Sequence, residues 1–319
     1  MKQILTFATA MLLAINVFAD VIPANDSRVV YVGRTQVVGT DVSFDWTATY
    51  FRLAFSGQNL TMRASDTKKN FYNVWIDSPT SAEPHRIIAV SGTDTVVELV
   101  DPKYLAKSRR AVHEVIVQKR TEGEQGTTTI HEFSVSKGTF IPADGLKKRQ
   151  LEFIGDSYTC GYGIDALSCK DRFTPETENA SRSYAAIVSR YFDADYVAIA
   201  HSGMGIARNY NSKFKGWWMP DRYLQTFDED STQVNRWDAT RSDFHPAMTI
   251  VYLGANDFST ALAPRYEDFR NHYYRLFGYI KANYGEDHPI LCVATKTHEY
   301  LFNYVRDLVN NCGLENVHY

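Results

Sequence analysis

The chain has 319 residues, which is enough for two domains with a sizeable buried core. Hydrophobic residues make up 44% of it and charged residues 22%, a composition that excludes a disordered protein. The formal net charge of -3 does not favour nucleic acid as a partner. Aromatic residues make up 13% of the chain, which is high. They could belong to a β-rich core or to a surface that stacks against sugars, and composition does not separate these two interpretations.

The first 19 residues have the pattern of a signal peptide. Lys2 is followed by a mostly apolar run from Ile4 to Phe18, and the small residues Val17 and Ala19 precede a cleavage point. The run is too short to span a bilayer comfortably, and no later segment of the sequence is long and apolar enough to do so. The sequence therefore predicts cleavage after Ala19 and a soluble protein that is secreted or periplasmic.

Export makes disulfide bonds chemically possible. The chain has four cysteines, which allow three complete pairings, and the sequence does not choose among them. Cys160 lies in a stretch of small and apolar residues and is predicted to be a buried thiol. The others are Cys169, Cys292 and Cys312. Because no C-x-x-C pair is present, a zinc ribbon or a redox motif is not expected.

From about residue 28 to 141, apolar and polar residues alternate with the period of two that is typical of half-buried strands. Turn-forming pairs such as Ser91-Gly92 separate the alternating segments. Strands at this spacing predict an antiparallel β-sandwich of about eight strands over residues 20–142. Trp46 and Trp75 lie in alternating segments and are expected in its core.

After a turn-rich link at 141–145, the pattern changes to short apolar runs that alternate with amphipathic helices. The predicted strands span 150–154, 194–200, 247–253, 288–295 and 315–319, and the predicted helices span 181–192, 266–284 and 301–313. Such alternation indicates a parallel sheet that is covered on both faces. Residues 143–319 are therefore predicted to form a doubly wound α/β domain.

The tripeptide Gly155-Asp156-Ser157 follows the first strand of this α/β domain. Catalytic groups of an open α/β sheet gather at the carboxyl ends of its strands. A serine on a tight strand-to-helix turn exposes its hydroxyl, and the helix N-terminus favours developing negative charge. Taken alone, the tripeptide could equally be a helix cap, because Asp and Ser both cap helices.

Two further motifs, HSGMG and GAND, follow the next two strands. Gly203 allows a backbone N–H to approach a substrate closely, although a plain βα turn would also use it. Asn256 offers an amide that can donate to an oxyanion, and Asp257 is expected to cap the next helix. A nucleophile with donors from three strand ends is what acyl transfer requires. We predict Ser157 as nucleophile and the Gly203 N–H and Asn256 amide as an oxyanion hole.

The three motifs resemble the serine, glycine and asparagine blocks of the SGNH (GDSL-type) hydrolases. The resemblance is closer to the family 2 carbohydrate esterases, and it covers nearly the whole chain after the leader. It rests on FIGDSYTCGYG, SGMGIARNY, MPDRY and YLGANDFS in the second region, and on FDWTATYFRLAFSG, NFYNVWID and QKRTEG in the first. The resemblance implies a jelly-roll sandwich joined to an SGNH domain. It also implies that O-acetyl groups are removed from xylan or a related polysaccharide through an acyl-serine intermediate.

The resemblance also implies a fourth block, an Asp-x-x-His-type segment whose histidine is the general base. None of the nine histidines lies in such a segment. His318 is inside the last predicted strand, His201 is expected to point away from Ser157, and His298 is the nearest alternative, with a surface loop as its expected role. We expect the base to lie beyond residue 319, in a longer protein. The alternative is a complete chain without its base, which would be a weak esterase or a non-catalytic carbohydrate-binding protein.

Substrate contacts are expected from the long loop between the second and third motifs. Trp217 and Trp218 could form a platform for a sugar ring or could pack this loop onto the domain. Arg208 either holds the second motif in place or contacts the substrate. The expected partner is an acetylated polysaccharide, and other acyl esters, including lipids, are the alternative. No metal or cofactor is expected, because the sequence has no H-E-x-x-H, no clustered metal ligands and no phosphate loop.

Overall fold

The computed structural model describes residues 19–212, 217–232, 234–259, 263–296 and 299–319. In this described part of the chain, no helix combines the length and the hydropathy that a membrane-spanning segment requires. The predicted signal peptide lies almost wholly outside the described residues, so its cleavage stays a prediction.

Residues 20–141 form an antiparallel domain with ten strands in its described residues. The elements are β1 (Asp20–Pro23), β2 (Val30–Val32), β3 (Gln36–Val38), β4 (Asp41–Phe44), β5 (Tyr50–Ser56), β6 (Asn59–Ile76), β7 (Arg86–Val100), α1 (Pro102–Leu105), β8 (His113–Lys119), β9 (Thr128–Ser136) and β10 (Thr139–Ile141). The strands join in the order β10-β5-β8-β6-β9-β4-β3, with β1 on β9, β2 on β5 and β7 on β6. The sheet curls into a sandwich around an apolar core, because alternate side chains of each strand point inward.

The antiparallel class of this domain was predicted correctly, but two details were wrong. The domain has ten strands rather than about eight, and Ser91-Gly92 is not a turn between strands. Gly92 instead lies inside β7 with a φ of +72°, at a register shift between β6 and β7. A glycine in the left-handed region accommodates such a bulge without ending the strand. The core positions of Trp46 and Trp75 are confirmed, since both side chains are buried.

The alternating segment VSFDWTATYFRLAFSG, residues 42–57, is interrupted between β4 and β5. Ala48 has a φ of +60° there, which a strand does not allow. The interruption turns the carboxylate of Asp45 toward the second domain, where it accepts the backbone N–H of Asp228 at 2.8 Å. The interruption therefore supplies a contact between the two domains.

The second domain contains a parallel sheet in the order β12-β11-β13-β14-β15. The strands are β11 (Arg149–Gly155), β12 (Ala194–Ala200), β13 (Met248–Tyr252), β14 (Ile290–Cys292) and β15 (Val317–His318). The helices are α2 (Ser157–Cys160), α3 (Tyr184–Tyr191), α4 (Met219–Arg222), α5 (Tyr266–Tyr284) and α6 (Glu299–Asn310). The predicted bounds of β12 and α5 agree with the structure, whereas β14 is shorter than expected.

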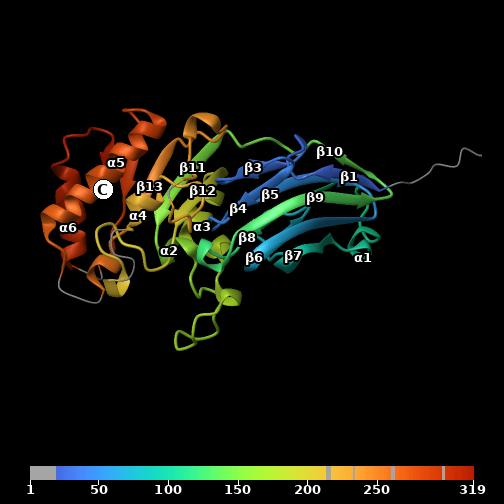
Figure 1. The fold of residues 1–319 in the computed structure, drawn as a ribbon, viewed down its shortest axis with the longest axis horizontal. Coiled ribbons are helices and arrows are strands. Elements are labelled where there is room, and N and C mark those ends of the chain that lie inside the picture. The colour runs from blue at the N-terminus through green and yellow to red at the C-terminus, as the bar shows by residue number, and fades with distance from the viewer. Residues whose placement is uncertain (1–18, 213–216, 233, 260–262, 297–298) are drawn as a thin grey trace, which may run out of the picture.

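Helices cover both faces of this parallel sheet, as the sequence predicted. Neighbouring residues of a strand point to opposite faces. Phe153 of β11 packs edge-on against Tyr184 of α3, with ring centroids 5.8 Å apart. The preceding residue, Glu152, accepts hydrogen bonds from Tyr223 after α4 and from Tyr284 at the end of α5. Figure 1 shows α5 and α6 at one end of the molecule and the sandwich strands at the other.

The four cysteines are free thiols, so the structure contains none of the three possible sets of disulfide pairs. Cys160 is fully buried, as predicted from its apolar surroundings. Burial raises the pKa of this thiol well above its ordinary value.

Candidate active site

The three motifs meet because the strands that carry them end at the same level. Gly155, the last residue of β11, pairs with Ala200 of β12 on one side and with Tyr252 of β13 on the other. The chain then continues from each strand into one motif. Since parallel strands place their carboxyl ends at one edge of the sheet, the motifs share that edge.

The side chain of Asn256 ties the three motifs together. Its amide donates one hydrogen bond to the Oδ2 atom of Asp156 at 3.1 Å and a second to the carbonyl of Met204 at 2.8 Å. Asp156 directly precedes Ser157, and Met204 directly follows Gly203. The buried asparagine therefore fixes the distance between the first and second motifs.

Ser157 is the first residue of the short helix α2 and is half-buried. Asp156 caps this helix by accepting the N–H of Tyr158 at 3.1 Å. The turn before the serine requires a glycine, because a Cβ atom at Gly155 would lie 2.0 Å from the Thr159 hydroxyl oxygen. The tripeptide therefore caps the helix and also forms the tight turn that places Ser157 at the helix N-terminus.

Gly203 occupies the third position of a tight turn that begins at His201. The N–H of Met204 donates to the carbonyl of His201 at 3.2 Å, and Gly203 has a φ of +81°. A positive φ at this position is the signature of a type II turn, which favours glycine. The turn type matters because it sets the direction of the peptide between Ser202 and Gly203, and therefore of the Gly203 N–H.

Two backbone donors at this edge are free. Within the described part of the chain, the N–H groups of Ser157 and Gly203 donate to no protein acceptor. The third predicted donor differs, because both hydrogens of the Asn256 amide are engaged by Asp156 and Met204. Free N–H groups beside a serine at a helix N-terminus form a local positive potential, which is what an oxyanion requires.

Asp257 does not cap the next helix, so the role expected for it was wrong. Its buried carboxylate accepts the backbone N–H groups of Ile206, Ala207 and Arg208 at 2.8–2.9 Å. The Arg208 guanidinium in turn donates to the Asp257 carbonyl. Arg208 therefore holds the second motif against the third, which is one of the two roles expected for it.

Two carboxyl groups lie close to the predicted oxyanion donors. Burial raises the pKa of Asp156 to about 7, and burial likewise raises the pKa of Asp257 to about 7. Below that pH, each group loses most of its negative charge. A full anion beside the oxyanion would oppose acyl transfer, so this arrangement limits the repulsion.

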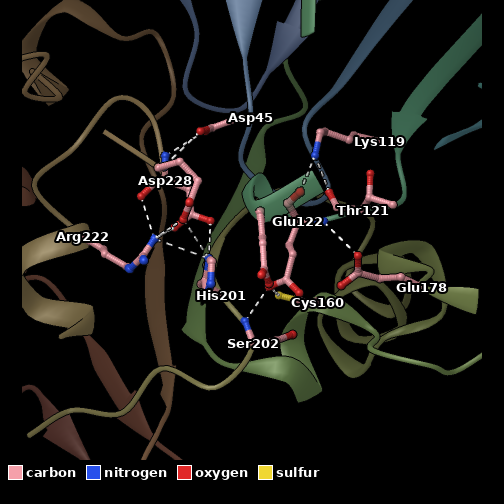
Figure 2. Close-up of polar contacts among 12 residues, drawn as sticks. Asp45, Lys119, Thr121, Glu122, Cys160, Glu178, His201, Ser202, Arg222 and Asp228 are labelled. Carbon is pink, nitrogen blue, oxygen red and sulfur yellow. Dashed lines mark hydrogen bonds and ion pairs between the residues drawn. The ribbon is translucent and has the colours of Figure 1, made fainter. Parts of the chain in front are cut away.

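Among the residues that the structure describes, no histidine is bonded to the nucleophile as a base. Within the described residues, no imidazole is hydrogen-bonded to the Ser157 hydroxyl. His318 is exposed on β15, as its predicted place in a strand implies, and His298 lies outside the described residues. His201 is buried and bonds through Nδ1 to Asp228 at 2.6 Å. Figure 2 shows this imidazole facing Asp228 and Arg222.

His201 belongs to a buried ion-pair cluster. Asp228 accepts from His201 and, at 2.6 Å, from the Arg222 guanidinium. Burial alone would lower the pKa of His201, but the charge of Asp228 and its hydrogen bond outweigh burial and raise the pKa to about 9. The imidazolium thus stabilises the loop that begins the Gly203 turn.

This cluster predicts a pH-dependent stability. The pKa of His201 is raised from 6.5 to about 9, so its contribution is complete below pH 6.5 and is lost as the pH rises through 9. We expect the free energy of unfolding to fall by about 3 kcal/mol over that range. Urea unfolding at a series of pH values measures this loss. The variant Asp228→Asn should flatten the slope between pH 7 and 9, and an unchanged slope would contradict the assignment.

The two tryptophans pack onto the domain. Trp218 stands edge-on to His272 of α5, with ring centroids 4.7 Å apart. The Arg222 guanidinium lies over the Trp217 ring, with its Cζ atom 5.8 Å from the ring centroid. The Trp217 carbonyl accepts a hydrogen bond from the side-chain amide of Asn209. Both side chains remain partly exposed. The packing role is therefore present, and exposed ring area is left for a ligand.

Two groups of described residues offer metal-ligand atoms within 4.8 Å of one another, but their surroundings do not suit a metal. They are Glu122, Cys160 and Glu178, and His201, Asp228 and Glu229. In the first, the Oε2 atom of Glu122 already accepts the Ser202 N–H and faces the Cys160 thiol. In the second, the Arg222 guanidinium already bonds both carboxylates.

Comparison with protein families agrees with this two-part arrangement. Residues 31–143 match the family described as carbohydrate esterase 2 N-terminal, and residues 151–313 match the GDSL-like lipases and acylhydrolases. The chain belongs to the GDSL-like lipases and acylhydrolases. Its preceding domain gives it the arrangement of the family 2 carbohydrate esterases.

Individual relatives of this GDSL-like chain are carbohydrate esterases. The cellulase/esterase CelE of Acetivibrio thermocellus is 32% identical over 271 residues, 82% of this chain and 32% of that protein. An acetylxylan esterase / glucomannan deacetylase of Cellvibrio japonicus is 33% identical over 224 residues, 69% of this chain and 57% of that protein.

A solved structure of a family two carbohydrate esterase from Clostridium thermocellum, in complex with cellohexaose, superposes with a TM-score of 0.81 at 29% identity. The superposition covers 91% of this GDSL-like chain and 87% of that one. The chain spans between roughly a third and two thirds of the length of the curated relatives it matches.

Proposed function

We propose that the chain is a carbohydrate esterase that removes O-acetyl groups from xylan or a related polysaccharide. The observation that carries the proposal is the pair of free N–H groups, those of Ser157 and Gly203, at one edge of the parallel sheet. Acyl transfer needs a nucleophile beside donors that are unoccupied in the ground state. The deacetylases among the relatives support the choice of substrate.

In the proposed mechanism, the Ser157 hydroxyl attacks the acetyl carbonyl carbon. The carbonyl oxygen becomes an oxyanion, which the N–H groups of Ser157 and Gly203 stabilise. The Asn256 amide also donates to the oxyanion, with the hydrogen that otherwise bonds Asp156. That hydrogen is the one shared because the bond to Asp156 is longer than the bond to Met204. Collapse expels the sugar alkoxide, which takes up the proton of the serine, and water then hydrolyses the acyl-serine.

Three further assignments belong to the same proposal. Residues 1–19 direct export, so the protein acts on polysaccharide outside the cytoplasm. The domain boundary lies at 142–143, a placement supported by the family matches, which end at 143 and resume at 151. The exposed parts of Trp217 and Trp218 contact the sugar chain.

The test of this proposal is acetate release. We expect the chain to release acetate from acetylated xylan or glucomannan, and to hydrolyse short-chain acyl esters in preference to long-chain ones. A preference for long-chain esters would favour a lipid substrate instead. Binding of cello-oligosaccharides without any acetate release would favour a non-catalytic carbohydrate-binding protein.

A further inference from the structure

A carboxylate of the sandwich domain reaches the centre of the catalytic domain. Glu122 follows β8 in the segment QKRTEG and is fully buried. Its Oε2 atom accepts the backbone N–H of Ser202 at 2.5 Å and faces the Sγ atom of Cys160 at 3.5 Å. Figure 2 shows the side chain extending between these two partners.

The two partners of Glu122 lie on the two elements that carry the free donors. Cys160 closes the helix that starts at Ser157, and Ser202 directly precedes Gly203 in the type II turn. One oxygen atom therefore links the nucleophile helix to the oxyanion turn. Since the Ser202 N–H is fixed, the peptide that follows it, which carries the Gly203 N–H, has less freedom to rotate.

Glu122 is itself held rigidly. Its backbone N–H donates to Glu178 at 3.0 Å, and its carbonyl accepts the buried ammonium of Lys119 at 2.9 Å. Burial and the charge of Glu122 raise the pKa of Glu178, so the pair does not bring two full negative charges together. The next residue, Gly123, packs so closely on Asp228 that a Cβ atom would lie 2.5 Å from its carboxylate oxygen.

We propose that Glu122 is a positioning residue, through which the sandwich domain sets the relative position of the Ser157 and Gly203 oxyanion donors. The inference rests on the proposed function of those two donors. The sandwich domain is then a part of the catalytic apparatus rather than an independent sugar-binding unit. Glu122 touches no substrate and acts through the Ser202 N–H.

The test compares three variants. Glu122→Ala should lower kcat for acetate release about 100-fold, the effect of misplacing one oxyanion donor, and change KM by less than about threefold. Glu122→Gln keeps an oxygen that accepts the Ser202 N–H and should restore most of kcat. Asn73→Ala is the matched control, because Asn73 is equally buried and bonds across the same interface, to Asn179 and Ser181, without touching the turn.

A second measurement does not depend on turnover. Amide hydrogen exchange of residues 201–204 should accelerate at least tenfold in Glu122→Ala and stay unchanged in Asn73→Ala. If Glu122→Ala does not fold, Glu122→Gln tests the inference instead. A neutral amide oxygen accepts the Ser202 N–H more weakly than a carboxylate does, so exchange of the Ser202 amide should accelerate severalfold. The inference is wrong if exchange is unchanged in the glutamate variants, or if Asn73→Ala lowers kcat as much as Glu122→Ala. A wild-type chain that releases no acetate overturns the proposed function, and the exchange result still decides the role of Glu122.

Discussion

Replacing Ser157 by alanine is expected to lower kcat for acetate release from acetylated xylan by roughly 10⁴- to 10⁶-fold. The hydroxyl is the only nucleophile in the proposed mechanism, and what remains in the variant is the oxyanion hole and substrate binding. Because Ser157 is half-buried and its hydroxyl makes no hydrogen bond within the described residues, its loss should cost little stability. Steady-state kinetics and thermal unfolding of the same preparation measure both effects.

Ser168→Ala is the control for this substitution. Ser168 is an exposed serine on the loop between α2 and α3, so the same chemical change is made away from the sheet edge. The control should keep the activity of the unmodified chain. A folded Ser157→Ala variant that released acetate at the normal rate would rule out the acyl-serine mechanism.

Replacing Gly203 by alanine is expected to lower kcat by about 10²- to 10³-fold, the usual cost of one lost oxyanion donor. Space is not the cause, because the nearest atom to an added Cβ is the Tyr210 Cβ at 3.6 Å. The cause is backbone conformation: a φ of +81° costs alanine about 1–2 kcal/mol. The chain can relieve this strain by rotating the peptide between Ser202 and Gly203, which carries the N–H of residue 203 away from the site.

Gly313→Ala is the matched control, because Gly313 has a φ of +69° and no atom within 4 Å of an added Cβ. It follows α6 and does not belong to the three motifs. Both variants should lose a similar amount of stability in urea unfolding, while only Gly203→Ala should lose kcat. Equal activity of the two variants would show that the Gly203 N–H does not stabilise the transition state.

The sequence predicted the sheet edge well because local patterns encode it. The apolar runs around Gly155, Ala200 and Tyr252 are short and bounded, and each is followed at once by its motif. A parallel sheet can align these runs in only one direction. The family resemblance added the order of the motifs, and the match over residues 151–313 confirms the family.

The roles of the acidic side chains could not be predicted, because their partners are distant in sequence. Asp257 was expected to cap the helix after it, but the backbone N–H groups that donate to its carboxylate lie about 50 residues earlier, at Ile206 to Arg208. Glu122 and Ser202 are 80 residues apart and lie in different domains. The only signal for Glu122 in the sequence was its place in QKRTEG, a segment noted for its resemblance and not for its chemistry.

The sequence by itself therefore determined the two domain classes, the family and the nucleophile candidate Ser157. These depend on periodicity and on short contiguous motifs, which can be recognised without knowledge of the tertiary contacts. The tertiary structure decided which donors are free and which are engaged. The Gly203 N–H is free, whereas both hydrogens of the Asn256 amide are already bonded. It also decided that a sandwich-domain carboxylate, Glu122, reaches the oxyanion turn. Hydrogen-bond satisfaction in a buried site is a property of the packed chain, because each group competes for partners that only folding brings within 3 Å or so.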